Sequence, residues 1–401
     1  MVTGTWTRGD PIVVFGDDWG RSVSTMQHLF RHIALDDPVI WINAIGHRPP
    51  TISVSDLKRA WEKVGAMVRP RSRRSGSGLS GGGAPAAIIE PRVLPWHGST
   101  VIHALNSAAL VRTIRRRLTS LGLSRPPFLV TGSPPSVGVV GRLGEAASIY
   151  FCMDDFLNFP GVSARMIAPL ERRLLHKVDG VVATAKSLTE SKRPSSGRAY
   201  HLPQGVNYDH FSAQRPEPDD MASIPRPRIG FAGSVGGACD LGLVRRLAEA
   251  HAGCSVVLVG MLTAEAKEID QLKRPNIYVL GPRPYADLPA YVQSFDVGII
   301  PYVLSDYTRA VDPLKLLEYL AAGLPVVSTA IPEVLKYAAH VSVAHSDDAF
   351  VSAVGGALSV DRASACERGR AVARQHTWER RSEELQRIMA EVVASRGGEG
   401  R

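Results

Sequence analysis

Short apolar segments rich in valine and isoleucine recur along this chain, and a helix-like pattern follows most of them. Each is bounded by glycine, proline or a polar turn, which is typical of buried strands in a parallel sheet with helical crossovers. We expect seven strands in the first half, at residues 12–15, 39–43, 93–96, 128–131, 149–153, 180–184 and 199–202. Six more are expected in the second half, at residues 228–232, 255–259, 276–280, 297–301, 325–329 and 340–343. The sequence therefore predicts an α/β protein with two doubly wound, Rossmann-like domains whose strand ends face a common crevice.

Changes of composition place the domain boundaries. Residues 1–211 form the first predicted domain and residues 228–375 the second. Residues 212–227 contain four prolines and several acidic side chains, a composition that disfavours helix and strand, and we expect a linker there. The apolar periodicity from Trp378 onward predicts a helix within residues 376–401, which can pack back on the first domain.

Charge is distributed unevenly over the 401 residues. Residues 1–210 hold 26 Lys and Arg against 15 Asp and Glu, whereas the remainder is slightly acidic. Part of this positive charge lies in residues 69–91, which are also rich in serine and glycine and are predicted to be a disordered loop. A basic first domain suits an acidic partner, such as an anionic membrane surface, a phosphorylated ligand or a nucleic acid. We expect no nucleic-acid partner, because the chain has no recognised nucleic-acid motif and no aromatic platform.

The loop and helix after the strand expected at 297–301 carry the most chemical information. Asp312 and Pro313 are a favoured cap and first-turn pair, so a helix is predicted to begin there with its N-terminus in the crevice. The free amides and dipole of that terminus favour an anion, and Arg309 and Lys315 add positive charge. A diphosphate fits such a site.

Glu318 follows Lys315 by three residues and lies on the same helical face. One face then offers a cation for phosphate and, one turn deeper, a carboxylate for sugar hydroxyls. The alternative interpretation is a surface ion pair between Lys315 and Glu318, worth a few tenths of a kcal/mol.

The stretch at residues 313–327, PLKLLEYLAAGLPVV, resembles the donor-site helix of GT-B-fold glycosyltransferases of the family 4 type. Four further motifs, at residues 150–156, 202–211, 280–285 and 308–311, resemble bacterial teichuronic-acid and exopolysaccharide glycosyltransferases. The resemblance implies a GT-B fold and a hexosyltransferase of cell-envelope polysaccharide synthesis. Its donor would be a nucleotide sugar, with UDP- and GDP-linked sugars favoured. Its acceptor would be a saccharide or a polyprenyl-diphosphate-linked glycan.

The resemblance also assigns donor-binding residues. Glu318 would bind the ribose hydroxyls, and Arg309 and Lys315 the diphosphate. The turn after the strand at 228–232 would let backbone amides approach the donor, although it could be an ordinary strand-to-helix turn. The remaining donor-binding candidates, in this turn and after the strand at 276–280, are Gly233, Gly236, Gly237, Arg283 and Tyr285.

Two positions depart from the family pattern. The second glutamate that often precedes the ribose-binding one by eight residues is replaced here by Ala310. The arginine and lysine expected after the first strand of the second domain are replaced by residues 236–240, in which Asp240 could instead contact the donor sugar. Both retention and inversion of configuration therefore stay open.

Acidic residues follow two strands of the first domain at the crevice. Asp154 and Asp155 are candidates for the general base that accepts the proton of an acceptor hydroxyl, and helix capping is the alternative. Because adjacent side chains point apart, at most one of them would serve. The acceptor-binding candidates are Asp17, Asp18, Arg21 and His97, the last of which could also be a capping or core histidine.

We expect no metal and no cofactor. The chain contains no Asp-x-Asp sequence, so positive side chains and a helix dipole would neutralise the leaving diphosphate. A sugar-nucleotide epimerase and a non-catalytic nucleotide-sugar binder remain alternative functions.

A basic helix in the first domain suggests where the protein would act. The start of the chain lacks a secretory signal and no apolar run is long enough to span a bilayer, so we expect a cytoplasmic protein. Peripheral binding to the cytoplasmic membrane face is a further hypothesis, and an ordinary solvated face is its alternative. The basic face would come from two expected helices, with Arg112, Arg115, Arg116 and Arg117 on the first and Arg172, Arg173 and Lys177 on the second.

Overall fold

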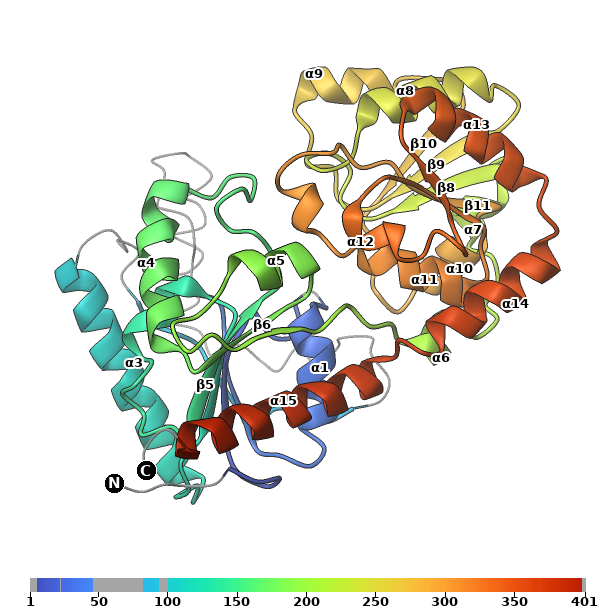
Figure 1. The fold of residues 1–401 in the computed structure, drawn as a ribbon. Coiled ribbons are helices and arrows are strands. Elements are labelled where there is room, and N and C mark those ends of the chain that lie inside the picture. Colours follow the sequence, from blue (N-terminus) through green and yellow to red (C-terminus); the bar gives the residue numbers. More distant parts are fainter. Residues whose placement is uncertain (1–5, 22, 46–81, 94–99, 399–401) are drawn as a thin grey trace.

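Two α/β domains make up the computed structural model (Figure 1), which describes residues 6–21, 23–45, 82–93 and 100–398. The first domain contains a seven-stranded parallel sheet in the order β3-β2-β1-β4-β5-β6-β7. Its strands are β1 (Ile12–Phe15), β2 (Val39–Ile42), β3 (Ala87–Ile89), β4 (Phe128–Thr131), β5 (Ala147–Cys152), β6 (Gly180–Ala183) and β7 (Ala199–His201).

Successive side chains of each strand point to opposite faces of this sheet, and both faces are packed against helices. Val13 and Phe15 of β1 pack in a cluster with α3 (Thr100–Ser120) and α4 (Ala164–Lys177). Ile12 and Val14 pack in a second cluster with α1 (Thr25–Ile33) and α15 (Trp378–Gly398). The sheet is therefore buried on both faces, which explains its continuous apolar strands. Two short helical segments, η1 (Pro134–Gly138) and α5 (Lys186–Ser191), complete the domain.

The second domain repeats this design around a six-stranded parallel sheet in the order β10-β9-β8-β11-β12-β13. Its strands are β8 (Arg228–Ala232), β9 (Ser255–Val259), β10 (Ile277–Gly281), β11 (Val297–Ile300), β12 (Val326–Thr329) and β13 (Ser342–Ala344). Its helical segments are α8 (Leu241–Ala250), α9 (Ala266–Ile269), η2 (Asp270–Leu272), α10 (Leu288–Gln293), η3 (Thr308–Ala310), α11 (Leu314–Ala322), α12 (Pro332–Leu335), α13 (Asp347–Leu358) and α14 (Arg362–Ala373).

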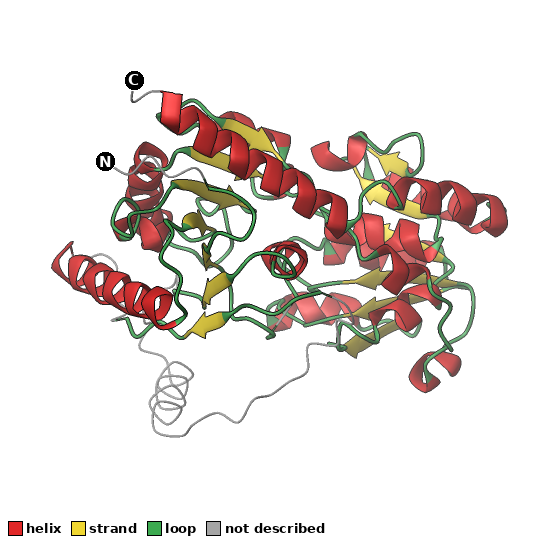
Figure 2. Cartoon of the chain, turned by 90° about the horizontal axis from the view of Figure 1, so that it is seen from below, coloured by secondary structure: helices red, strands yellow, loops and turns green. Residues whose placement is uncertain are grey.

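The chain crosses between the domains twice, and the two crossings lie side by side. Val206 and Thr377 form a parallel bridge, in which the Val206 amide donates to the His376 carbonyl at 2.8 Å. After the second crossing, α15 returns along the first domain, where it packs against α1 and β5 (Figures 1 and 2).

The third strand of the first sheet was predicted wrongly. It lies at Ala87–Ile89, within the stretch expected to be disordered, whereas Val93 lies outside any strand and residues 94–99 and 69–81 fall outside the described part of the chain. Ala87 and Ile89 point into the core while Ile88 is exposed, so this edge strand buries only alternate side chains. A three-residue strand next to glycines and prolines gives little periodicity to detect.

The segment expected to be a linker also forms structure. The helix α7 (Asp219–Ala222) lies within it, and the short helix α6 (Tyr208–Ser212), mostly in the expected first domain, ends at its first residue. Met221 is fully buried in the core of the second domain, together with Ile224. Pro218 stands at the start of α7, where proline is tolerated. The negative charges of two aspartates in the first turn interact favourably with the helix dipole.

Candidate active site

The start of α11 places a lysine beneath the turn that follows β8. Lys315 is buried, and its ammonium lies 4.5 Å and 4.6 Å from the ring centres of Phe231 and Tyr302 and donates to the Tyr302 hydroxyl. In the part of the chain that the structure describes, no carboxylate forms an ion pair with this ammonium. A buried cation without a counter-ion is costly, so the arrangement favours binding of an anion.

Glycine is required where the β8 turn passes over this ammonium. Gly233 has φ 153°, and a β-carbon there would lie 2.7 Å from Lys315 Nζ. Gly236 and Gly237 also have positive φ, at 119° and 62°. Positive φ at all three positions favours glycine, and a side chain at residue 233 would displace the Lys315 ammonium from its place beneath the turn.

Glu318 lies one turn further along α11. Burial raises the pKa of Glu318 to about 7, and the charge of Lys315 acts in the opposite direction. Burial also raises the pKa of Tyr285 well above its usual value, with a further contribution from the charge of Glu318, so the two groups interact electrostatically.

An aromatic group around Tyr285 joins the two domains. Its ring stacks on His210 at 4.9 Å and meets the edge of His28, from α1 of the first domain, at 5.4 Å. The His210 ring also contacts the Tyr285 carbonyl through Nε2 at 3.0 Å. Planar rings beside Glu318 offer a surface on which a nucleobase can stack.

The other donor candidates have more local contacts. Arg283 donates to Asp220 of α7 at 2.6 Å and to the Tyr291 hydroxyl at 2.8 Å, so its guanidinium is already paired. Asp240 caps α8 by accepting from the Leu243 amide at 2.9 Å, a structural role that sequence reasoning did not assign to it. Arg309 is exposed.

The helix start itself differs from the expectation. The N-cap of α11 is Pro313, and Asp312 does not cap the helix. The Asp312 carboxylate instead accepts from the Gln204 amide of the first crossing at 3.0 Å. A contact between residues so distant in sequence has no signature in the local pattern.

The two adjacent aspartates after β5 have different partners. Asp154 Oδ1 accepts from the Tyr307 hydroxyl of the second domain at 3.2 Å, and burial raises the pKa of Asp154. Asp155 pairs with Lys192 at 3.0 Å and accepts from Asn158 at 2.7 Å. The structure therefore leaves Asp154 as the carboxylate that faces the opposite domain.

Sequence analysis missed the buried ion network behind Asp155. Lys192 pairs with Glu171 of α4 at 2.8 Å, and the Tyr150 hydroxyl donates to the same glutamate at 2.9 Å. A glutamate on the apolar face of α4 was the only available signal.

The acidic residues after β1 mainly order their own loop. Asp17 accepts from Ser24 Oγ and Gln27 Nε2, both at 2.9 Å, and burial raises its pKa. Asp18 pairs with the exposed Arg21 at 3.2 Å. His97 lies outside the described residues.

A short loop of the second domain, residues 307–310, closes against the first domain and is called the clasp below. The Tyr307 ring meets the edge of Phe159 at 5.2 Å, and Ala310 is buried in the core cluster of the first domain. Ser187 donates to the Arg309 carbonyl at 3.5 Å. The position at which related enzymes often carry a second glutamate is thus occupied by an alanine that packs into the core cluster of the first domain.

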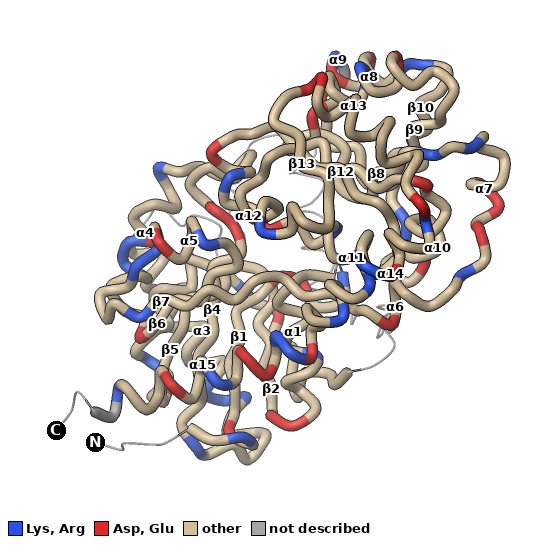
Figure 3. Tube along the Cα trace, turned by 45° about the vertical axis from the view of Figure 1, so that its right-hand side comes forward, with Lys and Arg blue, Asp and Glu red and all other residues tan. Residues whose placement is uncertain are grey.

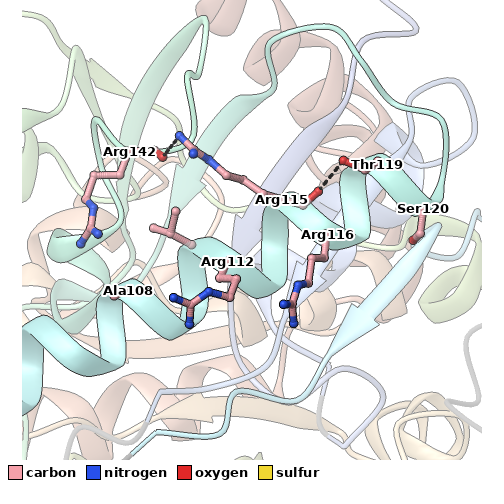
Figure 4. A pocket seen from close by; sticks show the side chains of 8 residues that line it. Ala108, Arg112, Arg115, Arg116, Thr119, Ser120 and Arg142 are labelled. Carbon is pink, nitrogen blue, oxygen red and sulfur yellow. Dashed lines mark hydrogen bonds between the residues drawn. The ribbon is translucent and has the colours of Figure 1, made fainter.

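A basic groove lies on α3, away from the crevice. It has a volume of about 600 Å³, and Arg115 within it donates to the Arg142 carbonyl at 2.7 Å (Figure 4). Basic residues also lie along α4, where Arg172 and Arg173 are exposed (Figure 3). The residues lining the groove are Ala108, Val111, Arg112, Arg115, Arg116, Thr119, Ser120 and Arg142.

None of the helices in the described ranges combines the length and the apolar character needed to cross a membrane.

Comparison with known proteins supports the fold and the resemblance. Residues 226–359 match the family described as "Glycosyl transferases group 1". A putative teichuronic acid biosynthesis glycosyltransferase of Bacillus subtilis, TuaH, is 31% identical over 180 residues, which are 43% of this chain and 45% of that protein. The chain thus matches less than half the length of this relative.

Solved structures share the two-domain architecture. The α,α-trehalose 6-phosphate synthase of Burkholderia multivorans has a TM-score of 0.63 at 12% identity, over 96% of this chain and 99% of the other. Anabaena HepE, in complex with UDP and glucose, has a TM-score of 0.64 at 12% identity, over 96% and 100% of the two chains. The chain has the GT-B fold, and the predicted resemblance to teichuronic-acid glycosyltransferases is confirmed.

Proposed function

We propose that this protein is a glycosyltransferase that moves a hexose from a nucleotide sugar to a saccharide or lipid-linked acceptor in bacterial cell-surface polysaccharide synthesis. The observation that carries the proposal is the buried ammonium of Lys315, which lacks a counter-ion within ion-pairing distance among the described residues and lies beneath the Gly233 turn. It belongs to the segment that matches the glycosyltransferase family. A diphosphate bound there would complete the charge balance.

The donor would bind to the second domain. Lys315 and the backbone of the β8 turn would hold the diphosphate, and the exposed Arg309 could reach it from the clasp. Glu318 would accept the ribose hydroxyls, with the base near Tyr285. A UDP-linked sugar is favoured, because HepE was solved with UDP and glucose and shares the fold.

In the transfer step, the acceptor oxygen forms a bond to the anomeric carbon of the donor sugar. The bond from that carbon to the diphosphate oxygen breaks, and its electron pair leaves with the nucleoside diphosphate. Asp154, whose pKa is raised by burial, would accept the proton of the acceptor hydroxyl. Lys315 would stabilise the charge that develops on the leaving diphosphate.

Binding of nucleotides tests this proposal. Thermal shift and calorimetry with UDP, GDP, ADP, dTDP and the corresponding nucleotide sugars should identify one nucleotide that stabilises the wild-type protein. Glu318→Gln should bind the same nucleotide more weakly, because an amide accepts the ribose hydroxyls less well than a carboxylate does. If no nucleotide or nucleotide sugar stabilises the wild type, the proposed function is wrong.

Calorimetric titration with the nucleotide sugar at pH 8 and at pH 6 tests the role of Glu318 more specifically. Only the ionised form of Glu318 can accept both ribose hydroxyls, and its pKa is about 7. The affinity of the wild type for the nucleotide sugar should therefore fall roughly tenfold from pH 8 to pH 6, whereas that of Glu318→Gln should not change. A nucleotide sugar is the appropriate ligand, because a terminal phosphate would itself titrate near pH 6.

We also propose that the basic groove on α3 binds the anionic cytoplasmic face of the membrane, where a polyprenyl-diphosphate-linked acceptor would be presented. The exposed side chains of Val101 and Leu105 precede the arginines on the same helix and would contact the lipid beside them. Each basic residue near anionic lipid contributes about 1 kcal/mol.

Flotation with vesicles tests the membrane proposal. The wild type should float with vesicles containing phosphatidylglycerol and be released by 0.5 M salt, approximately the range in which surface charge is screened. Replacing Arg112, Arg115 and Arg116 with glutamine should abolish flotation. The matched control replaces three exposed arginines of the second domain, Arg362 and Arg368 of α14 and Arg374 directly after it, and should float as the wild type does. Equal loss in both variants would indicate an effect of net charge and contradict a specific role of α3.

A further inference from the structure

Asp154 receives its hydrogen bond from the opposite domain. The Tyr307 hydroxyl, in the clasp, donates to Asp154 Oδ1 at 3.2 Å, although the two residues are 153 positions apart in sequence. In the described part of the chain, no other donor forms a hydrogen bond with this carboxylate. Tyr307 thus occupies one acceptor position of this carboxylate, on the side that faces the second domain.

The clasp holds Tyr307 in this place from both sides. Its ring meets the edge of Phe159, and the following residue, Thr308, is fully buried with its hydroxyl bonded to the Val303 carbonyl. Two positions after that, Ala310 packs in the core of the first domain. The phenol is thus positioned by packing on both domains.

Asp155 cannot take over this role, because Lys192 and Asn158 already occupy its carboxylate. A phenol hydroxyl and a sugar hydroxyl are the same kind of hydrogen-bond donor toward a carboxylate. We propose that Tyr307 occupies the place of the acceptor hydroxyl on Asp154 and must be displaced when the acceptor binds. This inference rests on the proposed transfer reaction and assigns Tyr307 as a gating residue of its acceptor site.

Occupation of Asp154 by Tyr307 would protect a bound donor from water. In hydrolysis, a water oxygen bonds to the anomeric carbon, the bond to the diphosphate breaks with its electron pair, and a water proton passes to Asp154. As long as the phenol donates to Asp154, water cannot take that position. When the acceptor binds, its hydroxyl would replace the hydrogen bond that Tyr307 donates to Asp154.

Donor hydrolysis without acceptor tests the inference. The probe is the nucleotide sugar that stabilises the wild type, and the variants are Tyr307→Phe and Tyr200→Phe. Tyr307→Phe should hydrolyse it roughly tenfold faster, in line with the loss of one hydrogen bond to a charged group, with an unchanged dissociation constant for the donor. Tyr200→Phe is the matched control, because its hydroxyl donates to a carboxylate, Glu391, at 2.9 Å on an exposed face of the first domain. It should hydrolyse the donor at the wild-type rate.

The double variant Asp154→Asn with Tyr307→Phe separates gating from a structural role. If the gain in hydrolysis depends on the carboxylate, the double variant should return to the wild-type rate or below. A Tyr307→Phe variant that binds the donor normally but hydrolyses it no faster would overturn the inference and leave the proposed function standing. Failure of the wild type to bind any nucleotide sugar would overturn both.

Discussion

Replacing Lys192 with methionine is expected to lower the free energy of unfolding of the first domain by about 3–5 kcal/mol. The ammonium lies 2.8 Å from a carboxylate oxygen of Glu171 and 3.0 Å from one of Asp155. The side chain of Lys192 is 7% exposed, that of Glu171 4% and that of Asp155 15%. Burial acts to lower the pKa of Lys192, but the hydrogen bond and charge of Glu171 outweigh it, so the pKa is raised. Methionine fills the space but leaves two carboxylates without their cation in a desolvated site.

Tryptophan fluorescence during urea unfolding reports on the first domain, which contains Lys192. All six tryptophans lie in residues 1–211 or at Trp378, and α15 packs on the first domain. Arg21→Met is the matched control, because it also lies in the first domain and its guanidinium pairs with Asp18 at 3.2 Å but is 81% exposed. The control should change stability by about 1 kcal/mol or less. Equal effects of the two substitutions would contradict a desolvated network at Lys192.

Most strands of the two sheets could be predicted because they bury a short continuous run of apolar side chains, as in β1, β5, β8 and β9. β8 and β9 begin and end where the pattern predicts, at Arg228–Ala232 and Ser255–Val259. β3 could not be predicted, because an edge strand of three residues with Ile88 exposed lacks such a run. α7 has no apolar periodicity either, because Met221 is the one buried side chain among its four residues.

The candidate site was predictable only where its residues are close in sequence. Lys315 and Glu318 share one helix, so their spacing already places them on one face. The partners of Asp154 and Asp155 come from distant segments, and which of the two faces the crevice depends on Lys192 and Tyr307. Nothing in the local pattern around the aspartates specifies those contacts, because they arise only when the domains are folded and brought together.

Replacing Lys315 with methionine is expected to reduce the turnover number for transfer by about 10²–10³-fold, or about 3–4 kcal/mol of transition-state stabilisation. The ammonium is the buried cation nearest the Gly233 turn, and it would counter the charge that develops on the leaving diphosphate. The folded protein should lose little stability, because the ammonium forms no ion pair in the described part of the chain and methionine still packs on Phe231 and Tyr302, although the charge that lowers the pKa of Glu318 is lost. A large loss of activity with a small change in stability is typical of a residue that serves a ligand rather than the fold.

Initial rates with saturating nucleotide sugar, measured together with unfolding in urea, test both parts of this expectation. Arg309→Met is the control, because Arg309 is also a predicted diphosphate ligand but is exposed, so its loss should reduce turnover by less than about tenfold. The nucleotide should also stabilise Lys315→Met less than the wild type, since weaker binding gives a smaller shift at the same concentration. If Lys315→Met instead unfolds more easily and binds the nucleotide normally, the lysine is a structural residue and the diphosphate site must lie elsewhere in the crevice. The two measurements thus separate an anion site from a packing role at the same side chain.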